Sequence, residues 1–130
     1  MSAFWLKMIG TSESPCPESY TRDYADFARK PRHIHPGDHM VLYAVGGSKR
    51  VFALAQVTSE IYGSGRERWP YRVDISYKVN LPVSCGVHID EVSTPERDLR
   101  RSIRRASYIE LRPEEYEQVA TKLQEALSKE

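Results

Sequence analysis

The segment that decides the fold runs from residue 34 to residue 77 and reads IHPGDHMVLYAVGGSKRVFALAQVTSEIYGSGRERWPYRVDISY. Its Pro36-Gly37-Asp38 triplet is typical of a turn that precedes a strand. Two apolar runs follow, at 40–45 and 51–61, and Gly46-Gly47 separates them. Because glycine adopts positive φ without steric cost, we expect a hairpin that turns at these two glycines.

The last part of this segment alternates between apolar and polar side chains. A period of two predicts a strand with one buried face and one face in water. Together with the hairpin, the alternation predicts a curled, mostly antiparallel sheet. The apolar or aromatic positions are Tyr71, Val73, Ile75, Tyr77 and Val79.

Two elements are expected before this sheet segment. Residues 4–9 form an apolar run, which predicts a first strand. Residues 18–30 contain aromatic side chains at spacings of four and three, which predicts a short helix that ends before a proline. These aromatic residues are Tyr20, Tyr24 and Phe27.

Further elements are expected after the alternating strand. They are extended pieces at 81–83 and 87–89, a helix that begins near residue 93 with Leu99 and Ile103 on its apolar side, and a strand at 107–111. A last helix is predicted from Pro113 to Leu127, because carboxylates occupy its first turn and apolar residues then recur at three-four spacing.

The composition is that of one folded domain spanning residues 1–130. Apolar residues make up 40% of the chain and charged residues 28%, which excludes a disordered chain. The formal net charge of +1 gives no global attraction to polyanions, so nucleic-acid binding would need a local basic patch. Cys16 and Cys85 have no metal-ligand spacing and make no disulfide framework. Because the sequence also shows no signal-peptide pattern and no long apolar run, we expect a cytoplasmic protein without a membrane partner.

The order and spacing of several short motifs resemble those of the EVE domain, a member of the PUA-like superfamily that is related to YTH domains. The resemblance covers nearly the whole chain and is to the small stand-alone prokaryotic EVE proteins. Its motifs are Phe4-Trp5-Leu6, Pro36-Gly37-Asp38, VTSEIY at 57–62, RWPYRV at 68–73 and IELRPEEY at 109–116.

This resemblance implies an α+β fold, a PUA-like pseudo-β-barrel of about six mostly antiparallel strands flanked by helices. It also implies a pocket between the end of the first strand, the helix that follows it and the mid-chain loops. In YTH relatives such a pocket takes an N-methylated adenine, and EVE relatives are associated with modified cytosine or other altered bases.

Aromatic side chains are the candidates for the walls of this pocket, because stacking on an aromatic ring contributes roughly 1–3 kcal/mol per base. Each of them has an alternative role in the core, since tryptophan and tyrosine commonly fill small barrels. Trp69 is the strongest candidate, because it follows three charged residues in a glycine-flanked loop. The predicted ligand-binding residues are Trp5, Tyr20, Tyr24, Tyr43 and Trp69, with Arg68 and Arg72 at the rim.

A cluster of arginines near residue 100 is the second candidate feature. On a helix that buries Leu99 and Ile103, these arginines spread over the exposed side. They are predicted to contact phosphates, which arginine binds in bidentate geometry, and the alternative is an ordinary solvated helix face. The predicted phosphate-contacting residues are Arg97, Arg100, Arg101 and Arg104.

Signals for metal binding and catalysis are weak. His33, His35 and His39 lie close together, but a zinc site needs three or four ligands in a defined geometry, and the only nearby carboxylate, Asp38, belongs to the turn. We therefore expect no metal and no other cofactor. Catalysis would need a titratable pocket residue with a shifted pKa, for which Glu13, Asp23 and His39 are the candidates.

The sequence favours a non-catalytic nucleic-acid-binding module that takes a modified or flipped-out base of DNA or RNA into an aromatic pocket. Extrusion of a base requires a few kcal/mol, which such a pocket must supply. The alternatives are a nucleotide-processing enzyme or small-molecule sensor that uses the same pocket, and an accessory protein of a defence or toxin system.

Overall fold

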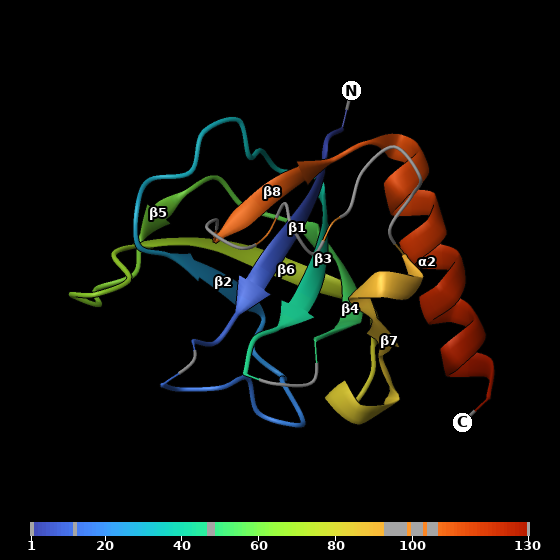
Figure 1. Cartoon of the computed structure of the whole chain (residues 1–130). Helices are drawn as coiled ribbons and strands as arrows, with labels where there is room; N and C mark the ends of the chain where they lie inside the picture. The colour runs from blue at the N-terminus through green and yellow to red at the C-terminus, as the bar shows by residue number, and fades with distance from the viewer. Residues whose placement is uncertain are drawn as a thin grey trace.

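The computed structural model describes residues 2–11, 13–46, 49–92, 99, 103 and 107–129. Within these residues the chain forms one curled sheet with a helix along one side (Figure 1). The elements are β1 (Phe4–Ile9), β2 (Tyr24–Phe27), β3 (His39–Ala44), β4 (Arg50–Val57), β5 (Tyr62–Gly63), β6 (Tyr71–Asn80), β7 (Val87–His88), β8 (Tyr108–Leu111) and α2 (Pro113–Ser128), with short 3-10 turns at Val83–Cys85 and Ile89–Glu91.

The strands form an eight-stranded sheet within the described residues, in the order β2-β6-β4-β3-β1-β8. The two-residue strands β5 and β7 lie off this path and pair with β6 and β4. The pair β1–β3 is parallel and the other pairs are antiparallel. The mostly antiparallel, barrel-like α+β sheet is therefore confirmed. The count of about six strands was too low, because the two shortest strands carry no periodicity that a sequence pattern can detect.

Each face of the sheet carries its own apolar core. In β1 the side chains alternate, so that Trp5 and Ile9 join the core inside the curl while Leu6 and Met8 join the core beneath α2. The helix contributes Val119 and Leu123, both fully buried, to this second core. Because a strand exposes alternate residues to opposite faces, a sheet covered on both sides gives the nearly continuous burial seen in β1, β3 and β4.

The predicted helix over 18–30 is wrong. Residues 24–27 form β2, which pairs with β6 and buries Ala25 and Phe27 while Tyr24 and Asp26 remain half-buried. Three aromatic residues at helical spacing were too few to define a face, and the same stretch also satisfies a period of two. Hydrogen bonds to β6 and burial of Phe27 decided between the two patterns.

Other predicted boundaries are confirmed or moved. The alternating strand is β6, in which Val73, Ile75 and Val79 are buried, and the last helix begins at Pro113 as expected. The second hairpin strand ends at Val57 rather than at residue 61. The expected extended piece at 87–89 contains the short strand β7, whereas the piece at 81–83 forms no strand and leads into the 3-10 turn Val83–Cys85.

The turn before β3 is organised by a buried carboxylate. Asp38 accepts hydrogen bonds from the backbone N–H of Ala3 at 3.0 Å, the backbone N–H of His35 at 3.0 Å and Nε1 of Trp5 at 2.9 Å. Burial alone would raise the pKa of Asp38, but these three donors hold it below its ordinary value. The Pro-Gly-Asp triplet therefore joins the start of β1 to the start of β3.

The two ends of the sheet approach each other and close the curl. Tyr108 on β8 packs edge-on against Phe27 on β2, with ring centroids 5.4 Å apart. The same ring also contacts Trp5, at 5.8 Å. Terminal strands that do not pair through their backbones are thus joined by aromatic side chains.

Candidate functional site

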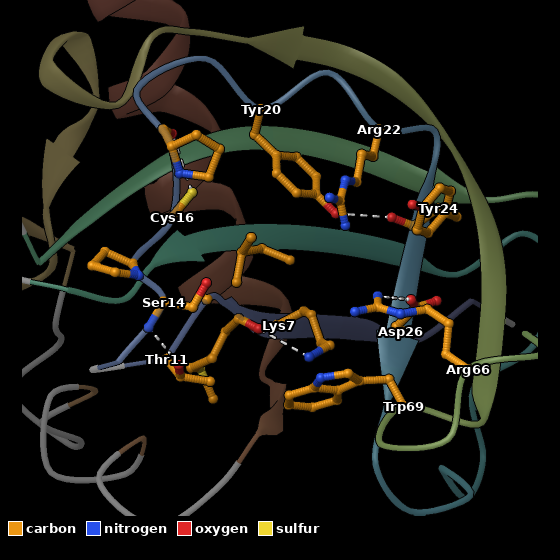
Figure 2. A pocket seen from close by; sticks show the side chains of 15 residues that line it. Lys7, Thr11, Ser14, Cys16, Tyr20, Arg22, Tyr24, Asp26, Arg66 and Trp69 are labelled. Atoms are coloured by element: carbon orange, nitrogen blue, oxygen red, sulfur yellow. Dashed lines mark hydrogen bonds and ion pairs between the residues drawn. The ribbon is translucent and has the colours of Figure 1, made fainter.

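A cavity of about 230 Å³ opens beside the end of β1 (Figure 2). It lies between residues 7–11 of β1 and its extension, the loop at 14–17, the segment from Tyr20 to Asp26, and the loop that precedes β6. The loop after β1 turns at Gly10, whose φ is +93° and which pairs with Pro15. A side chain there would collide with the backbone of Cys16, so the narrow turn that bounds the cavity requires glycine.

Lys7 lines this cavity from within the sheet. It is only 3% exposed, although it carries an ammonium group, and its Nζ donates to the carbonyl oxygen of Met8 at 2.9 Å. Nζ also lies 4.9 Å from the centre of the Phe27 ring. Burial lowers the pKa of Lys7 to about 8, and the charge of Asp26 opposes this effect. The side chain is therefore still mostly protonated at neutral pH.

Tyr20 and Tyr24 form an aromatic wall. Tyr20 is buried and donates its hydroxyl hydrogen to the backbone oxygen of Tyr24 at 3.1 Å, and burial raises its pKa to about 12. The ring of Tyr24 is covered by the guanidinium group of Arg72, 3.7 Å from the ring centre. Because the Tyr24 ring is already occupied, it contributes to the shape of the wall more than to stacking.

Asp26 connects β2 to the loop before β6. Its carboxylate accepts from Nε of Arg72 at 2.6 Å and from Nη1 of Arg66 at 2.7 Å, with a third contact from Arg72 Nη2 at 3.1 Å. Burial would raise the pKa of Asp26, but the two guanidinium groups hold it below its ordinary value. This ion pair network positions the loop that carries Trp69.

Trp69 reaches the cavity from that loop and is half-buried. Its backbone oxygen accepts a hydrogen bond from the hydroxyl of Ser64, which closes the loop onto itself. Figure 2 shows the indole ring at the opposite side of the cavity from Tyr20, with Lys7 between them. Among the predicted aromatic residues, Tyr24 and Trp69 combine partial exposure with a position in the cavity wall, and the Tyr24 ring is already covered by Arg72.

The structure corrects two of the predicted wall residues. Trp5 is 5% exposed and lies in the core, where its indole N–H is used by Asp38. Tyr43 is also buried and belongs to the core beneath α2, on the other face of the sheet from the cavity. Both follow from strand register, because neighbouring strand positions face opposite cores and the cavity adjoins only one end of one face.

The basic residues predicted at the rim of the pocket do not line the cavity. Arg72 is mostly buried and is held by Asp26, and Arg68 is exposed in the same loop, but neither lines the cavity. Arg22 and Arg66 line it instead. The predicted phosphate-contacting residues Arg97, Arg100, Arg101 and Arg104 lie outside the described residues, whereas Leu99 and Ile103 are buried as expected.

Sequence reasoning missed Lys7 and Asp26, although a signal for Lys7 was present. A lysine at an inward position of an apolar strand is unusual, because lysine is rarely buried without a partner. Alternation from Trp5 to Ile9 would have directed Lys7 to the inner face. Asp26 offered no such signal, because the aromatic spacing of its segment predicts a helix.

The remaining titratable groups give little support for catalysis or metal binding. Burial and the charge of Glu18 raise the pKa of Cys16 to about 11, which keeps this cavity thiol protonated and unreactive. His39 stacks on Phe4 and lies tilted against Tyr116, on the other face of the sheet. Across the described part of the chain, no group of three or more His, Cys, Asp or Glu side chains could hold a metal ion. No helix in that part is long and apolar enough to cross a membrane.

No protein-family model matches the chain, and no curated protein matches it. Solved structures share its fold. These include the NMR structure of Rpa0253 from Rhodopseudomonas palustris (16% identity, 92% of each chain covered, TM-score 0.62), the crystal structure of Atu2648 from Agrobacterium tumefaciens (16%, 92%, 0.60) and a hypothetical protein from Leishmania major (16%, 98%, 0.66). The likeness is one of fold alone and extends over almost the whole length of each chain.

Proposed function

We propose that this chain is a non-catalytic nucleic-acid-binding module that takes a single modified or flipped-out base into the cavity beside β1. The observation that carries the proposal is the half-buried indole of Trp69 on one side of a cavity of about 230 Å³, opposite the Tyr20 wall. A planar base offers two faces for such walls, and stacking does not depend on a particular base.

The size of the cavity fits one base better than a whole nucleotide. An apolar cavity of about 150 Å³ can hold benzene, so a cavity somewhat larger than this has room for a heterocyclic base. The sugar and phosphates of the same nucleotide would remain outside. A base that enters alone must first leave its stack, which is the geometry of base flipping or of single-stranded binding.

Two arginines at the cavity are suitable for the phosphates that remain outside. Arg22 and Arg66 both line the cavity, and the Arg66 side chain is 46% exposed while it is anchored by Asp26. An anchored guanidinium group loses less side-chain freedom when it binds a phosphate oxygen. Arg68, exposed in the same loop, is a third group of this kind.

We also propose that the fold is that of a PUA-like EVE domain. The curled, mostly antiparallel sheet supports this assignment. The position of the cavity supports it as well, because the cavity adjoins the end of the first strand, the segment after it and a mid-chain loop, where the EVE resemblance implies a ligand pocket.

The proposal is tested by replacing Trp69 and measuring oligonucleotide binding by fluorescence anisotropy. Loss of one stacking partner corresponds to about 1–3 kcal/mol, so Trp69→Ala should weaken binding of single-stranded DNA or RNA by about 5- to 150-fold. Because Trp69 is only half-buried, the variant should lose less stability than the roughly 3–5 kcal/mol expected of a core tryptophan.

Tyr62→Ala is the matched control, since Tyr62 is an exposed aromatic residue near the same loop that does not line the cavity. It should leave affinity unchanged. Equal affinities of the wild type and Trp69→Ala, or no binding of any plain or modified oligonucleotide by the wild type, would refute the proposed function.

A further inference from the structure

We infer that the cavity selects a base whose exposed edge carries two adjacent hydrogen-bond acceptors, as O6 and N7 of guanine do, and that the ammonium group of Lys7 binds this edge. The inference rests on the proposed function, because it names the class of base that the same cavity takes. It is carried by the hydrogen-bonding groups that the cavity leaves unused.

Lys7 supplies the main N–H groups that are left for a ligand. An ammonium group has three N–H bonds and no acceptor. Among the described residues, Nζ of Lys7 has one hydrogen-bond acceptor, the carbonyl oxygen of Met8. The side chain is 3% exposed and lines the cavity, as Figure 2 shows. Its remaining N–H groups are therefore available to a ligand in the cavity.

Two side-chain acceptors at the cavity, those of Asp26 and Thr11, already accept hydrogen bonds. The carboxylate of Asp26 accepts three hydrogen bonds from Arg66 and Arg72. The hydroxyl oxygen of Thr11 accepts from the backbone N–H of Ser14 at 2.9 Å. A ligand that presented mainly donors would therefore meet a carboxylate that two arginines already occupy.

A second donor lies in the wall of the same cavity. The indole Nε1 of Trp69 can only donate, and among the residues that the structure describes it has no hydrogen-bond partner. The hydroxyl of Tyr20 and the thiol of Cys16 direct their hydrogens to backbone oxygens and add no further free donor. The cavity thus offers donors, and above all one buried cation, to whatever enters it.

The hydrogen-bond donors of the cavity favour some bases over others. On the edge that faces the major groove in DNA, adenine places an amino group beside N7 and cytosine presents an amino group, and that donor would face the Lys7 ammonium. Guanine presents O6 and N7 side by side, and lysine or arginine on this pair is the commonest specific contact between proteins and bases. Acceptors from the ligand would also offset the unfavourable burial of the ammonium group.

The test measures the affinity of the wild type for short single-stranded oligonucleotides with cytosine flanks and one variable central base. Guanine and hypoxanthine keep both O6 and N7, 7-deazaguanine lacks N7, and 2-aminopurine lacks O6. We expect guanine and hypoxanthine to bind equally, and about 5- to 150-fold more tightly than adenine or cytosine, with the two singly deleted analogues in between.

The same series is then measured with the variants Lys7→Met and Lys129→Met. Lys129 is an exposed lysine at the end of α2, so its replacement removes the same charge away from the cavity. Lys7→Met should bind all central bases alike and retain the affinity that depends on Trp69, whereas Lys129→Met should keep the wild-type ranking. A guanine preference that survives in Lys7→Met would overturn the assignment to Lys7.

The failures of the two proposals are distinguishable. If the wild type binds every central base equally and Trp69→Ala still weakens binding, the selectivity is refuted and the proposed function stands. If no oligonucleotide binds, both are refuted. The analogue series on the wild type decides the selectivity for O6 and N7 even if Lys7→Met does not fold.

Discussion

At the scale of single residues, Lys7 is unusual because a cation is buried without an ion pair among the described residues. Its surroundings are an apolar strand, the ring of Phe27 and one carbonyl oxygen. An apolar residue of similar size would stabilise the fold more. Buried titratable groups of this kind cluster at functional sites.

Replacement of Lys7 by methionine should therefore stabilise the free protein. Burial lowers the pKa of Lys7 from 10.5 to about 8, so the unfolded chain binds more protons than the folded chain between these values. Stability of the wild type then rises with pH across this window. Below it, the buried charge is unfavourable by an amount on the order of 3 kcal/mol.

Urea denaturation at several pH values measures this effect. At pH 7 the Lys7→Met variant should be more stable than the wild type by about 1–3 kcal/mol. The difference should decrease as the pH rises from 8 to 10.5, because the wild-type lysine then loses its proton. A constant difference over this range would show that the lysine is not buried as a charged group.

The two tryptophans show that neighbours in sequence do not decide where a single side chain lies. Both are aromatic residues near basic or charged neighbours in sequence, yet Trp5 donates to Asp38 inside the core and Trp69 lines the cavity. The carboxylate that accepts from Trp5 lies 33 positions further along the chain. Its proximity depends on the parallel pairing of β1 with β3.

At the scale of elements, α2 shows how an apolar stripe fixes one face of a helix. Val119 and Leu123 are fully buried, whereas Leu127, one turn further on the same stripe, is 46% exposed. The first turn contains Glu115, which accepts from the backbone N–H of Arg112 at 2.7 Å and closes the N-terminus.

Matched leucine-to-alanine variants on α2 should therefore differ sharply in stability. Leu123→Ala removes a buried side chain and should destabilise the protein by about 2–5 kcal/mol. Leu127→Ala should change the free energy of unfolding by no more than about 0.5 kcal/mol, because the side chain is largely in solvent. Chemical denaturation measures both values, and similar losses would mean that α2 packs in a different rotation.

At the scale of the whole molecule, the curl is closed by side chains rather than by strand pairing. Tyr108 joins β8 to Phe27 of β2 and also accepts a hydrogen bond from the backbone N–H of Arg32 at 3.3 Å. These two strands stand at opposite ends of the sheet order. The cavity adjoins β2, so its shape depends on this closure.

Removal of the Tyr108 ring should loosen both ends of the sheet together. Tyr108→Ala should lose about 1–3 kcal/mol of stability, since the ring is half-buried and makes two edge-on aromatic contacts. Amide hydrogen exchange should become faster in β2 and in β8, which are distant in sequence.

Tyr108→Phe is the control for this prediction, because it keeps the ring and removes only the hydroxyl. It should remain close to the wild type in stability and exchange. If the alanine and phenylalanine variants behave alike, the ring contacts do not hold the two ends together.

The sequence by itself determined the elements whose pattern is local and long. The ten-residue alternation of β6, the stripe of α2 and the Pro-Gly-Asp turn before β3 are each visible in neighbouring residues, because side-chain direction repeats with period two in strands and 3.6 in helices. These patterns suffice to predict a curled, mostly antiparallel sheet with a terminal helix.

Only the tertiary structure decided which residues meet at the cavity. The segment containing Tyr20 and Asp26 is too short for its own periodicity to choose between helix and strand, and its pairing with β6 made that choice. Three features depend on strand register or on partners about 40 or more residues apart in sequence. They are the inward direction of Lys7, the contact of Asp26 with Arg66, and the placement of Trp5 in the core but of Trp69 at the cavity. Burial of a side chain is a property of these distant contacts, so a local pattern identifies candidates for a site but does not assemble them.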